Sequence, residues 1–281
     1  MTTDVLDDIV RDGMTALDGY PDAYQQLLRV LADPTSNTEH VAAVVRVDPV
    51  LTARLLAFVN AAHVGRRITN VAHAAMLVGR RQLRNLATAS AVVHMFRGIP
   101  EHLVDMGAYW RHSLAVAIAA NHLGLASPRR ITGLFVPALL HDIGALLLFV
   151  ARPNDARRIL IETENRDVEG RIVERSILGT DHAELGARLQ ASWQLPERTS
   201  AVARYHHEPS AAPEEMRRSV DVVHLADVAV SALQIGNAGE RSAHRLDEEA
   251  WTRSGLRPEG VRRSLDGLVD EVDEIARALG P

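Results

Sequence analysis

The stretch Leu134–Val150, LFVPALLHDIGALLLFV, places His141 and Asp142 side by side in the longest apolar run of the chain. Burying an ionisable pair in such surroundings is costly unless the pair has partners or coordinates a metal. In a helix, neighbouring side chains are about 100° apart, so both can border one inward cavity. The stretch therefore predicts a buried helix that can offer two ligands to one or two metal ions.

The composition favours helices along the whole chain. The 281 residues are 47% hydrophobic but only 4% aromatic, so the core must consist mainly of alanine, leucine and valine. Alanine and leucine lose the least free energy on entering a helix. A chain of this length can bury one large core or two modest ones. We expect an all-α fold.

Charge and residue types narrow the classes of partner. The formal net charge of −5 and a pI near 6.2 give no sign of a nucleic-acid-binding surface, so we expect no DNA partner. All 31 basic residues are arginine, which we attribute to coding bias rather than to phosphate recognition. The N-terminus is acidic and lacks an apolar signal segment, and the longest apolar run is shorter than a membrane span. We therefore expect a cytoplasmic protein without membrane association.

The chain contains no cysteine. Disulfides and thiolate ligands are therefore excluded, and a metal site would have to use histidine and carboxylate side chains. Nitrogen and oxygen ligands suit iron, manganese or a similar ion.

Turn residues and helical periodicity divide the chain at Gly98-Ile99-Pro100. In the first half, a helix from Tyr24 ends near Asp33-Pro34, Thr38 can cap the next helix, and Asp48-Pro49 starts a third. In the second half, the predicted helices run from near Glu101 through Ile118, through His141 and Asp142, over Ala156–Glu164, from Asp181 as cap to Trp193, from Pro196 to near His207, and over Val220–Leu233. Beyond Gly236 a charged segment leads to an amphipathic helix around Leu265–Ile275, which either covers the helical lobe or mediates self-association.

Seven imidazoles and carboxylates are scattered over the second half of the chain. They are His112, His141, Asp142, His182, His206, His207 and Asp227. Together such side chains can hold one or two metal ions that lower the pKa of a bound water and polarise a phosphoryl oxygen. The alternative is a buried hydrogen-bonded network without an ion.

His224 lies three residues before Asp227, on the same side of the predicted helix, and could donate a hydrogen bond to it. We expect His224 to support a ligand or to pack in the core rather than to bind the metal itself.

Several stretches resemble the HDOD domain, a bacterial relative of the HD-superfamily phosphohydrolases. They are LADPTSNTEHVAAVVRVDPVLTARLLAFVNAA and ITNVAHAAMLVGRRQLRNLA in the first half, and WRHSLAVAIAANHLGL, LLHDIGALLL, DHAELGARLQASWQLP, YHHEPS and VVHLADVAVSAL in the second. The resemblance covers residues 21–235 in order, which makes it far more specific than a lone His-Asp pair. It implies an all-helical fold of two packed lobes, one over about 21–100 and an HD-like helical bundle over about 101–235, with a helical tail over 236–281.

The related HD-GYP enzymes hydrolyse cyclic di-GMP at a di-metal centre, and their ligand pattern can be matched to this chain. The matches are His112 for the first helix histidine, His141 and Asp142 for the signature pair, His182 for the following histidine, His206 and His207 for the double histidine, and Asp227 for the closing aspartate. The resemblance therefore implies one or two divalent ions, such as Fe or Mn, held by these residues.

Two features depart from the active HD-GYP pattern. The residue after His-Asp-Ile-Gly is typically a lysine available to the phosphate, and here it is Ala145. After Glu208 the relatives continue into a Gly-Tyr-Pro loop, whereas this chain continues as Pro209–Pro213. Both departures argue against phosphodiester cleavage.

The resemblance implies a bacterial signal-transduction output or interaction module with an HD-like, metal-binding pocket and without catalysis. We expect its partner to be a signalling protein or a small ligand, and a homo-oligomer is an open alternative. The second hypothesis is a metal-dependent phosphohydrolase acting on a cyclic dinucleotide or another nucleotide phosphoester. The ligand set favours the enzyme, whereas Ala145 and the missing loop favour the binding module.

Overall fold

The structure, a computed structural model, describes residues 5–17, 30, 33, 35–47, 68–77, 79, 95–96, 99–166, 168–237 and 245–279. Within these residues every regular element is a helix and none is a strand, which confirms the predicted all-α class. The chain forms two compact units, one made of Met1–Leu17 and Gly98–Val269 and the other of Asp18–Arg97 and Asp270–Pro281.

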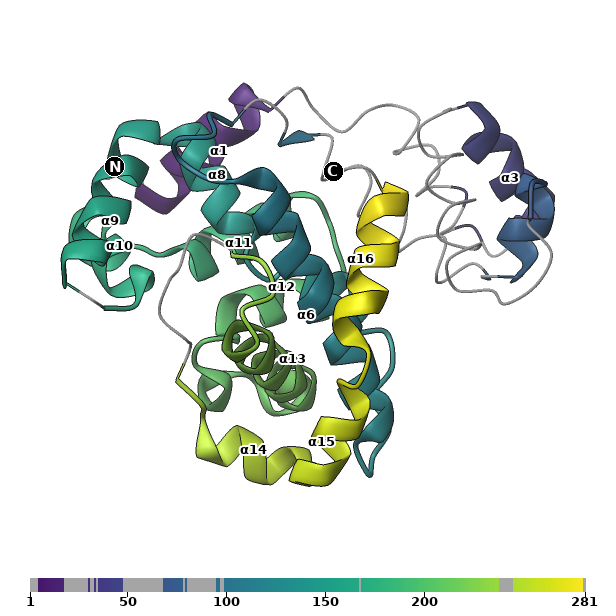
Figure 1. The fold of residues 1–281 in the computed structure, drawn as a ribbon. Helices are drawn as coiled ribbons and strands as arrows, with labels where there is room; N and C mark the ends of the chain where they lie inside the picture. The colour runs from purple at the N-terminus through teal and green to yellow at the C-terminus, as the bar shows by residue number, and fades with distance from the viewer. Residues whose placement is uncertain are drawn as a thin grey trace. The chain divides into compact units, whose positions relative to one another are not determined.

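The first unit contains almost all of the described helices (Figure 1). They are α1 (Val5–Ala16), α6 (Met106–Ala126), α7 (Phe135–Leu139), α8 (Ile143–Ala151), α9 (Pro153–Arg166), α10 (Gly170–Leu178), α11 (His182–Ser192), α12 (Glu197–Tyr205), the short 3-10 helix η1 (Pro209–Ala211), α13 (Glu214–Ala232), α14 (Glu248–Ser254) and α15 (Pro258–Ser264). In this unit α6 packs along α13, and α11 packs against both α8 and α12.

Local sequence explains where several of these helices begin. The carboxylates of Asp105, Asp181 and Asp247 accept backbone hydrogen bonds in the first turns of α6, α11 and α14, at 3.0, 2.9 and 2.8 Å, as N-cap residues do. The predicted cap at Asp181 is confirmed. At α13, the helix starts at Glu214, six residues before the predicted Val220.

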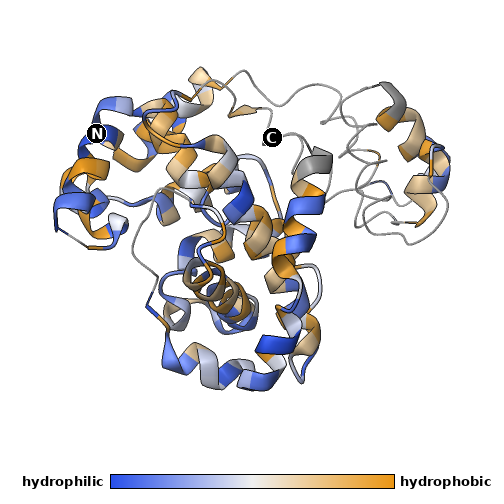
Figure 2. Ribbon diagram, viewed as in Figure 1, coloured by the Kyte–Doolittle hydropathy of each residue, from blue (hydrophilic) through white to orange (hydrophobic). Residues whose placement is uncertain are grey.

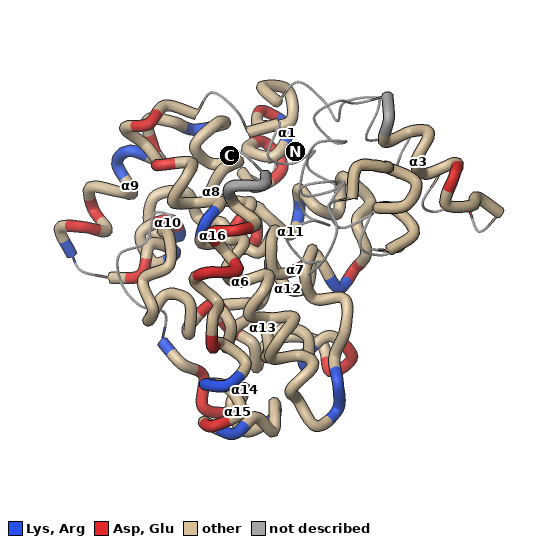
Figure 3. The backbone as a smooth tube through the Cα atoms, turned by 45° about the vertical axis from the view of Figure 1, so that its right-hand side comes forward, with Lys and Arg blue, Asp and Glu red and all other residues tan. Residues whose placement is uncertain are grey.

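Hydropathy separates the central helices from the peripheral ones. Hydrophobic residues line α6 and α8, whereas α14 and α15 are mostly hydrophilic (Figure 2). α8 contains no charged residue, while the adjacent α9 carries both signs of charge (Figure 3). The most apolar helices thus lie where the predicted ligands are.

The ends of the first unit pack onto this core. α1 contacts α8 and α11, and ion pairs join Asp7 to Arg188 at 2.7 Å and Asp12 to Arg152 at 2.7 Å. On the other side, α14 packs on α13 and α15 packs on α6. Helices from the two ends of the first unit therefore pack on α6, α11 and α13, which carry predicted ligands.

In the second unit the structure describes α3 (Thr38–Val47). Asn37, not the predicted Thr38, caps it, since its side-chain oxygen accepts from the His40 amide at 3.0 Å. Both residue types can cap a helix, so the sequence left the start uncertain by one residue. The predicted helices from Tyr24 and from Asp48-Pro49 fall mostly outside the described residues.

The last helix, α16 (Leu268–Leu279), begins in the first unit and continues into the second. It is amphipathic as predicted: Leu268, Val272 and Ile275 are buried. Across the described ranges, no single helix is long and apolar enough to span a membrane. Only Phe135–Ala151 taken together with Pro153–Arg166 meets that length and composition, and the two parts are bent by 120° at their junction.

Candidate metal centre

His141 and Asp142 lie in a turn between α7 and α8 rather than inside one helix. The single helix predicted through this stretch is therefore wrong, because apolar periodicity does not reveal a short break between two buried helices. Side chains satisfy carbonyl groups at this turn: Gln190 Nε2 donates to the Leu140 carbonyl at 2.8 Å, and His141 Nδ1 donates to the Ala138 carbonyl at 2.7 Å. Both His141 and Asp142 are buried.

Gly144 brings α8 against the start of α11. A Cβ atom at this position would lie 1.9 Å from the His182 carbonyl oxygen and 2.5 Å from the Gly186 amide nitrogen, so only glycine permits this approach. The contact holds Asp142, two residues before Gly144, close to His182. The packing of two helices thus explains the glycine of the His-Asp-Ile-Gly motif.

Gly236 makes a similar close contact between the end of α13 and α6. It has a φ of +72°, and a Cβ atom would lie 2.4 Å from both the Ala108 carbonyl oxygen and the His112 amide nitrogen. The Asn237 amide donates to the Ala108 carbonyl at 3.0 Å. The glycine therefore fixes α6 and α13, which carry His112 and Asp227.

The seven predicted ligands form two neighbouring groups. The first, called the inner group, consists of His112 on α6, His141 in the α7–α8 turn and Asp227 on α13. Asp227 Oδ1 lies 3.1 Å from His112 Nε2 and 3.7 Å from His141 Nε2. All three residues are buried.

The second, called the outer group, consists of Asp142, His182 at the start of α11, and His206 and His207 at the end of α12. Asp142 Oδ1 lies 3.1 Å from His206 Nε2 and 3.5 Å from His182 Nε2. The Nε2 atoms of His182 and His207 are 2.8 Å apart. Asp142 also links the groups, since its Oδ2 lies 3.2 Å from His141 Nε2. The structure therefore brings all seven side chains together.

Hydrogen bonds on the far side of three imidazoles direct their Nε2 atoms into the cluster. The Nδ1 atoms of His141 and His206 donate to backbone carbonyls at 2.7 and 2.8 Å. The Nδ1 of His182 donates to Glu174 Oε2 at 2.8 Å, and the same oxygen accepts from the His182 amide at 2.7 Å. In this tautomer the Nε2 lone pair faces the cluster, as in a metal-binding imidazole held by an outer partner.

Four ligand atoms are buried without a hydrogen-bond partner in the part of the chain that the structure describes: Nε2 of His112, His141 and His206, and Oδ1 of Asp142. Yet carboxylate oxygens lie 3.1–3.2 Å from these nitrogens. These pairs are close but miss the angles of a hydrogen bond, and the ligand atoms of each group all lie within 4.8 Å of one another, near enough to share one ion. Since buried polar atoms are nearly always bonded, the residues fit a metal ion better than a network without one.

The electrostatics of the cluster also favour a positive charge within it. Burial alone would lower the pKa of His141, but the carboxylates of Asp142 and Asp227 outweigh burial and raise it to about 10. Burial alone would raise the pKa of Asp142, but the neighbouring imidazoles of His141 and His206 outweigh burial and lower this pKa well below its usual range. Without an ion, His141 would hold a proton between the two carboxylates. A metal ion would take the place of that proton.

Two residues support the ligands. His224 Nδ1 donates to the His206 carbonyl at 2.7 Å, and its Nε2 accepts from the Asp247 amide at 3.0 Å. The sequence suggested that His224 could donate to the Asp227 carboxylate. In the structure its Nδ1 holds the backbone of His206. Glu174, which the sequence reasoning missed, orients His182. A charged residue in an amphipathic helix gave no signal that could have singled it out.

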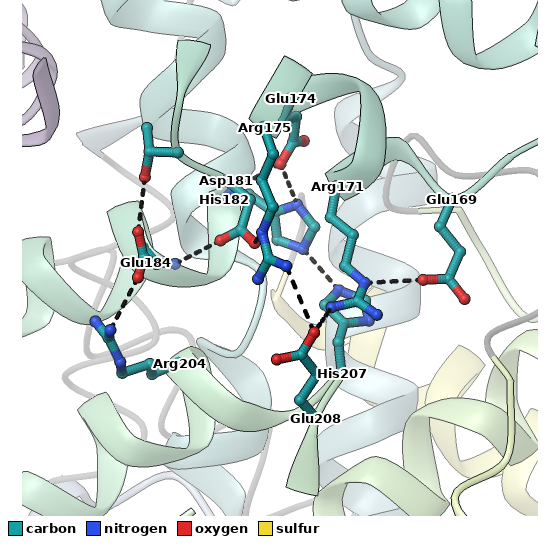
Figure 4. Close-up of polar contacts among 11 residues, drawn as sticks. Glu169, Arg171, Glu174, Arg175, Asp181, His182, Glu184, Arg204, His207 and Glu208 are labelled. Carbon is teal, nitrogen blue, oxygen red and sulfur yellow. Dashed lines mark hydrogen bonds and ion pairs between the residues drawn. The ribbon is translucent and has the colours of Figure 1, made fainter. Parts of the chain in front are cut away.

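The members of the outer group differ in their surroundings. Asp142 and His182 border an apolar cavity of about 30 Å³, together with Ala145, Phe149 and Ile159. His207 is half-buried, and the charged side chains of Arg171 and Arg175 lie beside it and Glu208 (Figure 4).

The chain belongs to the HDOD family, because the HDOD domain matches residues 17–209. The resemblance found in the sequence is thereby confirmed. The chain is also 23% identical over 228 residues to an uncharacterized protein of Treponema pallidum (strain Nichols), a match that spans 80% of this chain but only 44% of that protein.

Solved structures share the fold. An HDOD domain protein of unknown function from Geobacter sulfurreducens has a TM-score of 0.78 at 23% identity, covering 96% of this chain and 97% of that one. A protein of Shewanella amazonensis SB2B provisionally named a phosphohydrolase has a TM-score of 0.75 at 24% identity, covering 96% and 98%. A protein of Marinobacter aquaeolei VT8 provisionally named a signal transduction protein has a TM-score of 0.74 at 24% identity, covering 94% and 60%.

Proposed function

We propose that this HDOD protein is a signal-transduction module whose HD-like pocket binds one or two divalent metal ions, such as Fe or Mn, without turning over a substrate. The observation that best supports metal binding is the burial of four donor atoms that point into the cluster without hydrogen-bond partners among the described residues. Bound ions would satisfy them and neutralise the buried carboxylates of Asp142 and Asp227.

Two features favour a module without catalysis. Ala145 stands at the first turn of α8 beside the cavity, so the cation that active relatives offer to a phosphate is missing there. The cavity that adjoins Asp142 and His182 measures about 30 Å³, room for about one water. Pockets that enclose small-molecule ligands have volumes of about 300–1,000 Å³.

The module would act through a signalling protein or a small ligand, or through self-association, in the cytoplasm. The name of the Marinobacter relative supports signalling. We propose neither DNA nor a membrane surface as a partner. Both are large anionic surfaces, and a protein with a net charge of −5 has no overall electrostatic attraction to them.

A metal-dependent phosphohydrolase acting on a cyclic dinucleotide or another nucleotide phosphoester is the second candidate. One observation favours it: His207 of the outer group is only half-buried, and open metal sites are typical of catalytic centres. The name of the Shewanella protein points the same way.

The decisive experiment combines metal analysis with turnover. Metal-free protein is loaded with Mn²⁺ or Fe²⁺, and metal content is compared between the wild type, His141→Ala and the control His122→Ala, whose Nδ1 contacts the Ser264 carbonyl outside the two groups. We expect wild type and control to bind one or two ions, His141→Ala to bind fewer, and no loaded protein to cleave cyclic dinucleotides or an aryl phosphodiester.

Turnover that His141→Ala abolishes would replace the module with the phosphohydrolase. Equal metal content in wild type and His141→Ala would contradict the metal site.

A further inference from the structure

Two arginines of α10 reach towards the residue that follows the double histidine. Arg171 and Arg175 are four residues apart and therefore lie on one face of the helix. The Nη1 atoms of both contact the same oxygen, Oε1 of Glu208, that of Arg175 at 3.5 Å (Figure 4). One carboxylate thus holds two guanidinium groups in place.

Each guanidinium group has a second carboxylate that fixes its orientation. Arg171 Nε donates to Glu169 Oε2 at 2.8 Å, and Arg175 Nε donates to Asp181 Oδ2 at 2.7 Å. With Nε engaged in this way, the Nη1 atoms of both side chains are presented to Glu208. The donors would keep their direction if the Glu208 carboxylate moved away.

The two arginines lie beside the outer group. Asp181, the partner of Arg175, directly precedes His182, and Glu208 directly follows His207. The Nε2 atoms of these two histidines are 2.8 Å apart. An anion held by Arg171 and Arg175 would therefore lie next to the ligands of the outer group.

The three side chains differ in exposure. Those of Glu208 and Arg175 are 48% and 49% exposed, whereas that of Arg171 is 17% exposed. The half-exposed Glu208 side chain can move into solvent. Arg171 and Arg175 would then keep Glu169 and Asp181 as partners, while their Nη1 atoms would be left to donate to another anion.

We propose that Arg171 and Arg175 form a binding subsite for the phosphate group of a monoester, and that the Glu208 carboxylate occupies this subsite when no ligand is bound. The planar fork of a guanidinium matches phosphate oxygens, and the Nη1 groups that contact Glu208 can donate to two of those oxygens once Glu208 has moved. The subsite supplies guanidinium donors from α10, whereas Ala145 supplies no cation from α8.

This subsite is independent of the proposed metal ions, and the experiment uses metal-free full-length protein so that the two proposals fail separately. Methyl phosphate is titrated at about pH 8, where a monoester is a dianion, and binding is followed by phosphorus NMR. Dimethyl phosphate, a diester with one charge, is the comparison ligand. The variants are Glu208→Gln and the double variant Arg171→Gln/Arg175→Gln.

The chain offers a matched control in the neighbouring pair Arg204 and Glu184, joined at 2.8 Å between α12 and α11 (Figure 4). We expect Glu208→Gln to bind methyl phosphate about fivefold more tightly than the wild type, because it removes the competing charge. The double arginine variant should bind at least about tenfold more weakly. Glu184→Gln and Arg204→Gln should stay within about twofold of the wild type.

Glu208→Gln keeps the proposal testable even if the double variant fails to fold. If the arginines only tie α10 to the η1 turn, Glu208→Gln lowers the melting temperature without strengthening phosphate binding, and the proposal is overturned. Equal binding by every variant, or dimethyl phosphate bound as tightly as methyl phosphate, would also overturn it.

Discussion

The inner and outer groups are built from the same residue types but differ in their access to solvent. The inner group joins α6, the α7–α8 turn and α13, and its three side chains are at most 4% exposed. The outer group includes the half-buried His207, next to a charged network on α10. A closed site suits an ion that is retained, whereas an open site can meet a ligand. Burial, more than ligand type, therefore separates their roles.

Asp142→Asn should have the largest effect, because Asp142 belongs to the outer group and its Oδ2 also lies 3.2 Å from His141 Nε2 of the inner group. Replacing its carboxylate removes a charged ligand from the outer group and a negative charge beside the inner one, and we expect the affinity for Mn²⁺ to fall at least about 100-fold at both sites. Calorimetric titration measures both affinities, with the exposed Asp266→Asn as control. Loss at one site alone would show that Asp142 does not link the groups.

Gly144→Ala should disturb the outer group through the backbone. The added Cβ would lie 1.9 Å from the His182 carbonyl oxygen, so α8 and α11 must separate, and we expect the free energy of unfolding to fall by about 3 kcal/mol. The control is Gly260→Ala, because a Cβ at Gly260 meets no atom within 4 Å. Denaturant unfolding measures both variants. A destabilised control, or an unchanged Gly144→Ala, would contradict this account of the packing.

Glu174→Gln tests whether the outer group depends on the orientation of His182. An amide accepts hydrogen bonds less strongly than a carboxylate, so we expect about 30-fold weaker Mn²⁺ binding at the outer site. The inner site should keep its affinity, because the hydrogen bonds from Glu174 described above go to His182, a member of the outer group. Equal weakening of both sites would mean that the two groups do not act separately.

His207→Ala should give the smallest effect, about tenfold weaker binding at the outer site. His207 is the most exposed of the seven predicted ligands, and water can take its place on an ion. The matched comparison is His206→Ala, which removes a fully buried ligand of the same group. Titration with Mn²⁺ should show the larger loss for His206→Ala, and the reverse order would contradict the assignment of an open side.

The sequence could predict the members of the cluster but not how they are held. A family motif carries the residue types in order, so all seven predicted ligands, and the cap at Asp181, could be predicted before their geometry was known. The break in the helix at His141 could not be predicted, because two short buried helices have the same apolar pattern as one.

Contacts between distant segments were also beyond the sequence. Glu174 and Gln190 act only because α10 and α11 pack beside the α7–α8 turn. In the sequence, Arg171 and Arg175 are two arginines among 31. Their importance comes from the position of Glu208, which depends on tertiary packing rather than local pattern.

We propose that the two groups together hold one or two ions. Anomalous scattering at the manganese absorption edge, from crystals grown with Mn²⁺, tests it most directly. We predict an anomalous peak in at least one of the two groups, which are His112, His141 and Asp227 on the one hand and Asp142, His182, His206 and His207 on the other. Crystals that show no anomalous peak at either group, while Mn²⁺ is bound elsewhere, would contradict the account.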